Sequence, residues 1–300
     1  AIKNTELTQL FIAVFFLIFA FACGVEESGA PPPQDALYNP LGLAAHPNGR
    51  YLLVSNAVFD RKYNQSFISV IDTFEKKIIK GLNTEIDLFA GEIKLTNICQ
   101  TEANQTTPCE DRIIGMVSSR DLNTLTSFEL SEEDDRLAIN CGQTKNSNRC
   151  GGIFVQHSGL LEKSSDAPYS IALDHRGAYL SHINTGAVSS WRLIDRPPFV
   201  QFGCQLQLPG ANLLAQHPST NSVLVSDRFG RSLFHAETLA QDDGQCQLRL
   251  LESSSVNSSA LTNEHQGIAF SADGTRLYLV SGFDGALKVY ATSLQTDGSI

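Results

Sequence analysis

The chain has 300 residues, of which 18% are charged, and its formal net charge at pH 7 is −10. This acidic balance argues against nucleic acid as a partner and against electrostatic binding to anionic lipid. The length past the first 23 residues suits a single domain with one continuous core.

The first element in chain order is an uninterrupted apolar run from Leu10 to Ala22, which ends at Cys23. Its 13 residues are too few to cross a bilayer as a helix and fit the hydrophobic region of a signal peptide. Ala20 and Ala22 are small residues directly before Cys23, which resembles a lipoprotein-processing site, although Leu is commonest where Ala20 stands. Cys23 is therefore predicted to carry a lipid; the alternative is a plain signal peptide cut near Ala22.

The next segment, residues 24–37, is acidic, small and rich in Pro, and it has no apolar period. Such a composition predicts an extended, solvated tether, although an ordinary disordered N-terminus would look the same. The expected organisation is a signal peptide over residues 1–23, a tether over residues 24–37 and one folded domain over residues 38–300.

From residue 38 onward, one phrase recurs about five times: an apolar strand, a turn with Gly, Asn or Asp, and a second apolar strand. Clear copies begin at Gly42, Ser170, Leu213 and Gly267, and a looser copy surrounds Arg112. Apolar residues alternate with others in each run, as in strands. One copy buries too little surface to be stable alone, so neighbouring copies must stack into a shared core.

The second strands of these copies begin 44 to 66 residues apart. Propeller blades repeat every 40 to 45 residues or so, and loop insertions explain the excess. The sequence therefore predicts an all-β fold, a β-propeller of at least five four-stranded blades, and of six or seven if the chain is truncated. A two-sheet sandwich is the alternative, but sandwiches do not usually repeat one phrase. The predicted inner strands are Gly42–Ala45, Ser170–Leu173, Leu213–Gln216 and Gly267–Ser271.

The stretch from Leu43 to Asn56, LAAHPNGRYLLVSN, and the stretch from Ser271 to Ser281 resemble the YVTN-type, lactonase-like β-propeller repeat. The stretch from Val117, VSSRDLNTLTSFEL, is similar to blade strands of bacterial envelope lipoproteins. The resemblance covers roughly residues 38–293 and implies a propeller. It does not imply one function, because this repeat serves lactonases, sensor domains and binding scaffolds alike.

Six cysteines follow Cys23, and none has the two-residue spacing typical of zinc ligands. In an exported protein they indicate three disulfides. Six cysteines allow 15 pairings, so the connectivity stays open. Sequence proximity favours two pairs that each close a polar loop and leaves a third by elimination: Cys99 with Cys109, Cys141 with Cys150, and Cys204 with Cys246.

Residues with chemical potential are few. His46, His175 and His217 recur near the turn after the inner strand, which favours a structural role. The starts of the inner strands frame the usual ligand site of a propeller, so Glu264, His265, Asn39 and Asn212 are predicted to face one funnel. The first two are candidates for acid–base catalysis and the two Asn residues for ligand binding. No metal or cofactor is expected, because no motif for nucleotide, phosphate or zinc is present.

Two functions from different classes remain open. The favoured one is non-enzymatic: a lipoprotein, anchored by its lipid alone to the outer membrane on its periplasmic or surface face, whose loops bind a protein or glycan partner. The other is a lactone hydrolase that uses the channel mouth. Such an enzyme needs a convergent set of charged residues, and only one carboxylate, Glu264, is placed there by the sequence.

Overall fold

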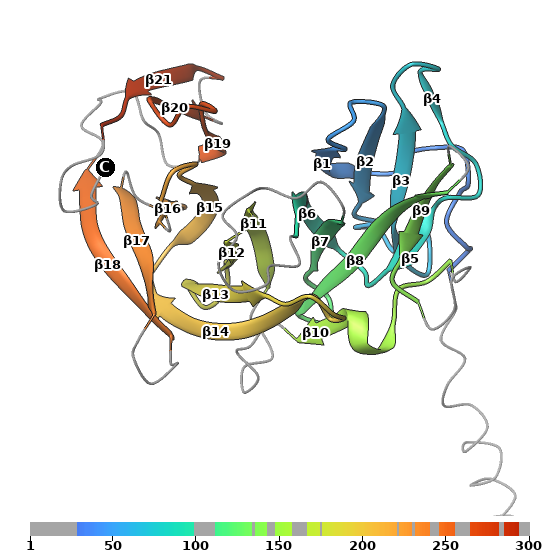
Figure 1. Cartoon of the computed structure of the whole chain (residues 1–300), viewed down its shortest axis with the longest axis horizontal. Helices are drawn as coiled ribbons and strands as arrows, with labels where there is room; N and C mark the ends of the chain where they lie inside the picture. Colours follow the sequence, from blue (N-terminus) through green and yellow to red (C-terminus); the bar gives the residue numbers. More distant parts are fainter. Residues whose placement is uncertain are drawn as a thin grey trace, which may run out of the picture.

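The computed structural model of the chain describes residues 29–98, 112–133, 136–142, 148–157, 167–174, 176–220, 222–229, 232–240, 246–255, 265–281 and 285–293. In these residues, strands form five antiparallel sheets, and the only helical element is the short 3-10 turn η1 (Gly152–Phe154). Figure 1 shows the sheets arranged as blades around a common centre. The predicted all-β propeller is therefore confirmed.

Each blade begins with its inner strand and proceeds outward along the chain. Blade 1 contains β1 (Pro40–Ala45), β2 (Tyr51–Asn56), β3 (Ser66–Asp72), β4 (Lys77–Ile78) and β5 (Thr84–Ile86). Blade 2 contains β6 (Ala90–Asn97), β7 (Ile113–Ser119), β8 (Thr124–Glu133), β9 (Arg136–Asn140) and β10 (Val155–His157). Blade 3 contains β11 (Pro168–Asp174), β12 (Gly177–His182), β13 (Ala187–Leu193) and β14 (Val200–Gln207).

The two remaining blades follow the same order. Blade 4 contains β15 (Ala211–Gln216), β16 (Ser222–Asp227), β17 (Ser232–Ala240) and β18 (Cys246–Ser255). Blade 5 contains β19 (His265–Phe270), β20 (Arg276–Ser281) and β21 (Leu287–Ala291). The four predicted inner strands correspond to β1, β11, β15 and β19. The inner strand of the looser copy is β6, which the repeated phrase does not reveal.

Not every blade has the four strands that the sequence predicted. In blades 1 and 2 the third strand is shared by two short outer strands, so each sheet has five strands. β3 pairs with β4 near its end and with β5 near its start, and β8 pairs with β9 and β10 in the same divided manner. Blade 5 has three strands within the described residues.

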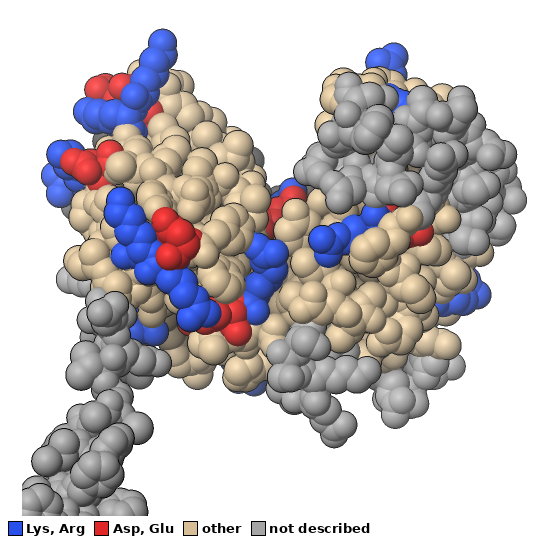
Figure 2. Space-filling model, turned by 180° about the vertical axis from the view of Figure 1, so that it is seen from behind, with Lys and Arg blue, Asp and Glu red and all other residues tan. Residues whose placement is uncertain are grey.

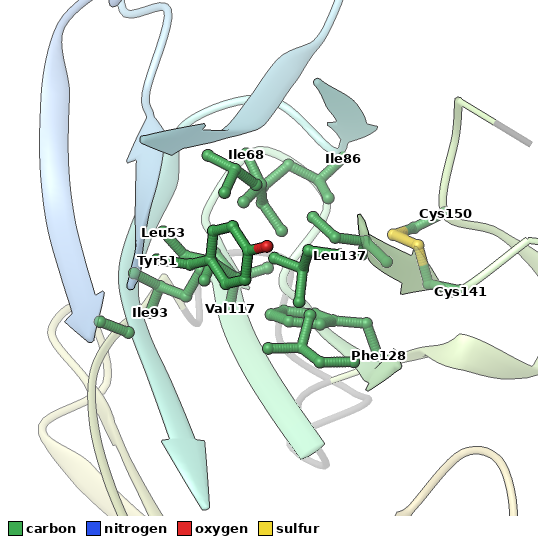
Figure 3. Close-up of a cluster of buried hydrophobic side chains, with 14 of the residues drawn as sticks. Tyr51, Leu53, Ile68, Ile86, Ile93, Val117, Phe128, Leu137, Cys141 and Cys150 are labelled. Atoms are coloured by element: carbon green, nitrogen blue, oxygen red, sulfur yellow. A yellow bond between two sulfur atoms is a disulfide. The ribbon is translucent and has the colours of Figure 1, made fainter. Parts of the chain in front are cut away.

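The core lies between the blades. Figure 3 shows the cluster between blades 1 and 2, where Leu53 and Ile68 meet Ile93, Val117 and Phe128. All five side chains are fully buried. Burying each one stabilises the fold by about 1.5–3 kcal/mol relative to leaving it exposed. The alternating apolar residues of the phrase therefore point at a neighbouring blade wherever a sheet face meets one.

Two of the predicted disulfides are present. Cys141–Cys150 closes a loop beside the core of blades 1 and 2, and Cys204–Cys246 links β14 of blade 3 to β18 of blade 4. Each cross-link should contribute on the order of 3 kcal/mol through the unfolded state. The predicted pair Cys99–Cys109 lies outside the described residues, as does Cys23.

Part of the predicted tether lies against blade 1. The Ala30 N–H donates to the Lys62 carbonyl (3.2 Å), and the Asn64 N–H donates to the Ala30 carbonyl (3.0 Å). The Asn83 side chain donates to the Pro33 carbonyl. This part of the tether is therefore not the fully solvated segment that the sequence predicted. Backbone groups of the loop after β2 form hydrogen bonds with it.

The five blades form an open arc rather than a closed ring. In Figure 1 the chain runs from blade 1 through neighbouring blades to blade 5, and a sector between blades 5 and 1 is unfilled. Figure 2 shows the same sector from behind as a deep notch between two lobes. Among the described residues, one face of blade 1 and one face of blade 5 therefore have no neighbouring blade.

Candidate functional site

The inner strands surround the centre of the arc and all begin at the same end, which we call the mouth (Figure 1). In blades 1–4 the residue before the inner strand has a positive φ, between 47° and 83°. Its carbonyl accepts a hydrogen bond from the residue that follows the second strand of the same blade. The pairs are Asn39 with Ala57, Phe89 with Arg120, Ala167 with Ile183, and Gly210 with Arg228.

Every inner strand also carries a register shift near its start. Such a bulge turns backbone groups away from the sheet. A buried serine of the second strand bonds to these groups. Ser55 Oγ accepts from the Gly42 N–H (2.9 Å) and donates to the Gly91 carbonyl of blade 2 (2.6 Å). We call this arrangement the serine clamp, because it joins one blade to the next.

The serine clamp recurs around the arc. Ser118 donates to the Tyr169 carbonyl of blade 3 (2.9 Å). Ser181 accepts from the Ser170 N–H (3.1 Å) and donates to the Asn212 carbonyl of blade 4 (2.5 Å). The sequence alone did not predict a role for these serines. Their signal was the Ser that follows the last apolar residue of the second strand in four copies of the phrase.

The predicted ligand-binding Asn residues do lie at the mouth. Asn39 is exposed, and its positive φ of 49° places it at the repeated turn before the inner strand, where Asn is tolerated. Asn212 is buried, and its carbonyl completes the serine clamp. Glu264 lies outside the described residues. His265 is the first residue of β19, and the structure places its backbone at the mouth.

A charged group that the sequence did not predict lies along the inner strands. Glu92 of β6 accepts from the Ser170 Oγ–H (2.6 Å) and from the Ile171 N–H (2.8 Å) of blade 3, and Lys94 contacts its other oxygen (2.5 Å). Ser170 Oγ in turn accepts from the Leu214 N–H of blade 4 (3.1 Å). The carboxylate thus accepts from one hydroxyl and one backbone N–H of the next inner strand.

Two arginines occupy equivalent positions at the mouth, directly after the second strands of blades 2 and 4. Arg120 is half-buried, and its guanidinium carbon lies 5.2 Å from the ring centre of Phe59 and 5.7 Å from that of Tyr169. Burial, with a smaller contribution from Arg228, lowers the pKa of Arg120 below its usual range. The guanidinium nevertheless stays charged at neutral pH.

Neither arginine has a carboxylate partner in the part of the chain that the structure describes. The acid next to Arg120, Asp121, pairs instead with Arg61 at 2.7 Å. Arg120 Nε is buried and has no hydrogen-bond acceptor among the described residues. A buried donor without an acceptor is rare in folded proteins and points to a missing partner.

The loops around the mouth expose large apolar side chains. Phe59, Leu122 and Phe229 follow the second strands of blades 1, 2 and 4 and are all exposed. The ring of Phe59 lies 6.1 Å from that of Phe89, so the loops of blades 1 and 2 touch. Apolar, aromatic and cationic groups therefore lie together at the mouth.

The turns of the repeated phrase lie at the end of the propeller opposite the mouth. His46 and His217 each accept a hydrogen bond through Nδ1 from the backbone two residues on, at Asn48 (3.3 Å) and Ser219 (3.2 Å). Burial lowers the pKa of His217. The structural role predicted for these two histidines is confirmed, and His175 lies outside the described residues.

Two features are absent from the described residues. No group of three His, Cys, Asp or Glu side chains in them is placed to hold a metal ion. No helix in the same residues has the length and apolar character to span a bilayer. The predicted signal-peptide region, Leu10–Ala22, is not among them.

The fold is shared with solved propeller structures of low sequence identity. No family model and no curated protein matches the chain. A protein from Lactobacillus plantarum is 14% identical with a TM-score of 0.58, over 88% of this chain and 70% of its own. A candidate 6-phosphogluconolactonase from Bacteroides uniformis is 13% identical with a TM-score of 0.54, over 91% and 80%. A second such candidate, from Bacteroides fragilis, has 11% identity and a TM-score of 0.53, over 84% and 65%.

These similarities define the class of the protein at the level of fold. The chain is a β-propeller of five blades that resembles lactonase-like propellers in architecture. Identities this low carry no residue roles from one protein to the other, because one propeller fold serves many functions.

Proposed function

We propose that the chain is an exported lipoprotein, anchored to the outer membrane through a lipid on Cys23, whose propeller binds a protein or glycan partner. The export step is supported by the apolar run before Cys23 and by the two disulfides, which persist in oxidising compartments. The binding role is supported by the side chains gathered at the mouth.

The exposed apolar residues at the mouth are the observation that carries the binding role. Phe59, Leu122 and Phe229 are 46%, 56% and 70% exposed. They stand on loops held by rigid blades, which is where recognition residues usually lie. Arg61 and Lys62 follow Phe59 by two and three residues, and protein interfaces are enriched in aromatic residues and Arg.

The loop closed by Cys141–Cys150 is the second element of the proposed binding surface. Its end is joined to blade 1, because the Glu85 N–H donates to the Asn148 carbonyl (2.6 Å) and the Cys150 N–H donates to the Glu85 carbonyl (2.9 Å). A disulfide and two hydrogen bonds thus hold both ends of the loop against the propeller. A preorganised loop loses less entropy on binding than a free one.

Photo-crosslinking tests the binding role. A crosslinking amino acid at position 59 should yield a discrete adduct in cells. The matched control is position 74. Phe74 is also exposed, but it lies in the turn after β3, at the end of the propeller opposite the mouth. Deleting residues 142–149 should abolish the adduct at position 59. Equal adducts at both positions, or none at position 59, would contradict the proposal.

The anchor has its own test. Intact mass of protein extracted from membranes should show acyl chains on Cys23 and no free thiol before reduction. A soluble form cut before Cys23 would contradict the anchor and leave the binding surface unaffected.

A lactone hydrolase is the second candidate function. It is favoured by the candidate 6-phosphogluconolactonases among the structures of similar fold. Glu264 and His265 are its predicted acid–base residues. If the protein hydrolyses members of a lactone panel and Glu264→Ala lowers the rate by about a hundredfold or more, the scale of an acid–base group, the enzyme replaces the scaffold.

A further inference from the structure

We propose that Arg120 and Arg228 form a binding site at the mouth for a small oxyanion, the carboxylate or phosphate group of a polar ligand. This site adjoins the loop surface that docks the proposed partner, and the two share Phe59. It rests on three features of the described residues: the unpaired arginines, their position in the repeat, and the groups around Arg120.

The first feature is the absence of counter-charges. The protein has an excess of ten negative charges, so an arginine can readily find an acidic neighbour. Three acids near the mouth are already engaged: Asp121 pairs with Arg61 (2.7 Å), Asp87 accepts from Thr124 Oγ1 (2.7 Å), and Glu92 contacts Lys94 (2.5 Å). A fourth, Asp227, precedes Arg228 and accepts from the Phe229 N–H (2.9 Å). Arg120 and Arg228 have no ion pair in the described part of the chain.

The second feature is the common origin of the two side chains. Both follow the second strand of a blade, and both backbone N–H groups donate to the carbonyl before the inner strand, at 3.2 Å for Arg120 and 2.7 Å for Arg228. The two cations therefore project from equivalent, rigidly held positions on blades 2 and 4. The charge of Arg228 adds, after burial, to the lowered pKa of Arg120.

The third feature is the setting of the Arg120 guanidinium. Phe59 and Tyr169 lie 5.2 Å and 5.7 Å away and fix its plane through cation–π contacts. Its Nε is buried without an acceptor. A planar guanidinium held in one orientation presents parallel N–H donors that match the two oxygens of a carboxylate or phosphate.

Isothermal titration calorimetry on the full chain tests the site. The probes are sodium gluconate and inorganic phosphate, at constant ionic strength, with glucose as a neutral control. Wild-type protein should bind one or both anions saturably in the millimolar range and should not bind glucose. Because charge-assisted hydrogen bonds would be lost, Arg120→Gln should weaken binding about tenfold or more. Arg228→Gln, which removes an exposed partner, should weaken it by a smaller factor.

The matched control is Arg192→Gln. It removes the same charge from an exposed side chain of β13 that bonds only to Gln201, so anion affinity should stay within about twofold of wild type. Arg120→Lys keeps the charge but loses the planar fork, and an intermediate affinity is expected.

Several results would overturn the site. These are the lack of saturable anion binding by wild-type protein, equal affinity in folded Arg120→Gln and wild type, or an equal loss in Arg192→Gln. If Arg120→Gln does not fold, Arg228→Gln decides, since unchanged affinity in that variant then refutes the two-arginine site. Crosslinking at position 59 is independent of these outcomes, so failure of the anion site leaves the partner-binding proposal standing.

Discussion

The blade faces inside the arc and the two faces at its open ends are built from the same repeated phrase, yet they differ in burial. Leu43 on β1 is 60% exposed. Its equivalents in the next three blades, which pair with the same position of the second strand, are at most 4% exposed: Ile93, Ile171 and Leu214. Burial at this position is therefore decided by the neighbouring blade and not by the local sequence.

Blade 5 shows the same contrast within one sheet. Leu277 and Leu279 point toward blade 4 and are buried. Val280, Leu287 and Val289 lie on the opposite face and are exposed. Val280 also stands where the earlier blades have the serine of the clamp. Within the described residues, the clamp serine thus lies on second strands whose blade has a following blade, and blade 5 has an apolar residue at that position.

The largest effect should come from truncating a side chain at the compared position. Ile171→Ala is expected to lower the free energy of unfolding by about 2–5 kcal/mol, because it leaves a cavity between blades 2 and 3. Leu43→Ala should change it by no more than about 0.5 kcal/mol, since the side chain is already largely in water. Equilibrium urea unfolding measures both. Similar losses in the two variants would show that the open face of blade 1 is covered in solution.

A second pair of variants compares glycines at equivalent places in blades 1 and 5. A Cβ on Gly42 would lie 2.7 Å from both the Ile93 nitrogen and Ser55 Oγ. A Cβ on Gly267 would meet only Val280, at 3.4 Å. Gly42→Ala should therefore destabilise by about 1–3 kcal/mol through overpacking, whereas Gly267→Ala should be close to neutral. Thermal melts of both proteins decide, and a destabilised Gly267→Ala would contradict an open face on blade 5.

The serine clamp gives a third comparison. Ser181→Ala leaves the buried Ser170 N–H and the Asn212 carbonyl without their partner, so a loss of about 1–2 kcal/mol is expected. Val280→Ser introduces the same hydroxyl at the open end, where the effect should stay within about 0.5 kcal/mol. Urea unfolding again provides the readout. Equal effects at the two sites would mean that the clamp does not depend on an adjoining blade.

Much of the fold could be predicted because its signal is local and repeated. The strands of the phrase and the Gly, Asn and Asp turns recur in sequence, so stacked blades follow from the period. β6 escaped detection because the stretch AGEIKLTN has no turn of the phrase after it. That blades 1 and 2 each have two short outer strands was not predicted either. The pairing of these strands depends on which part of the long third strand has no other partner.

The site was less predictable, because its parts come from different blades. The sequence placed Asn39 and Asn212 at the mouth, but their backbone roles depend on strand ends that only the fold brings together. Arg120 and Arg228 follow the second strands of blades 2 and 4, and aligning those strand ends would have paired them. Their lack of counter-charges could not be predicted, since Asp121 stands next to Arg120 and yet pairs with Arg61.

The smallest expected effect concerns the turn after β19 in blade 5, where the hydrogen bonds to Asp273 all come from the turn itself. Asp273 accepts hydrogen bonds from the Ser271 hydroxyl and then from the N–H and hydroxyl of Thr275, and these lower its pKa from 3.8 to about 2. A lowered pKa in the folded state stabilises the fold above the unfolded value, and this contribution disappears as the pH falls from 3.8 through about 2. Asp273→Asn should therefore melt slightly below wild type at pH 7, and the difference should narrow in that acidic window. A difference in melting temperature that stays constant down to the acid limit would show that this turn is not formed in solution at the free end of blade 5.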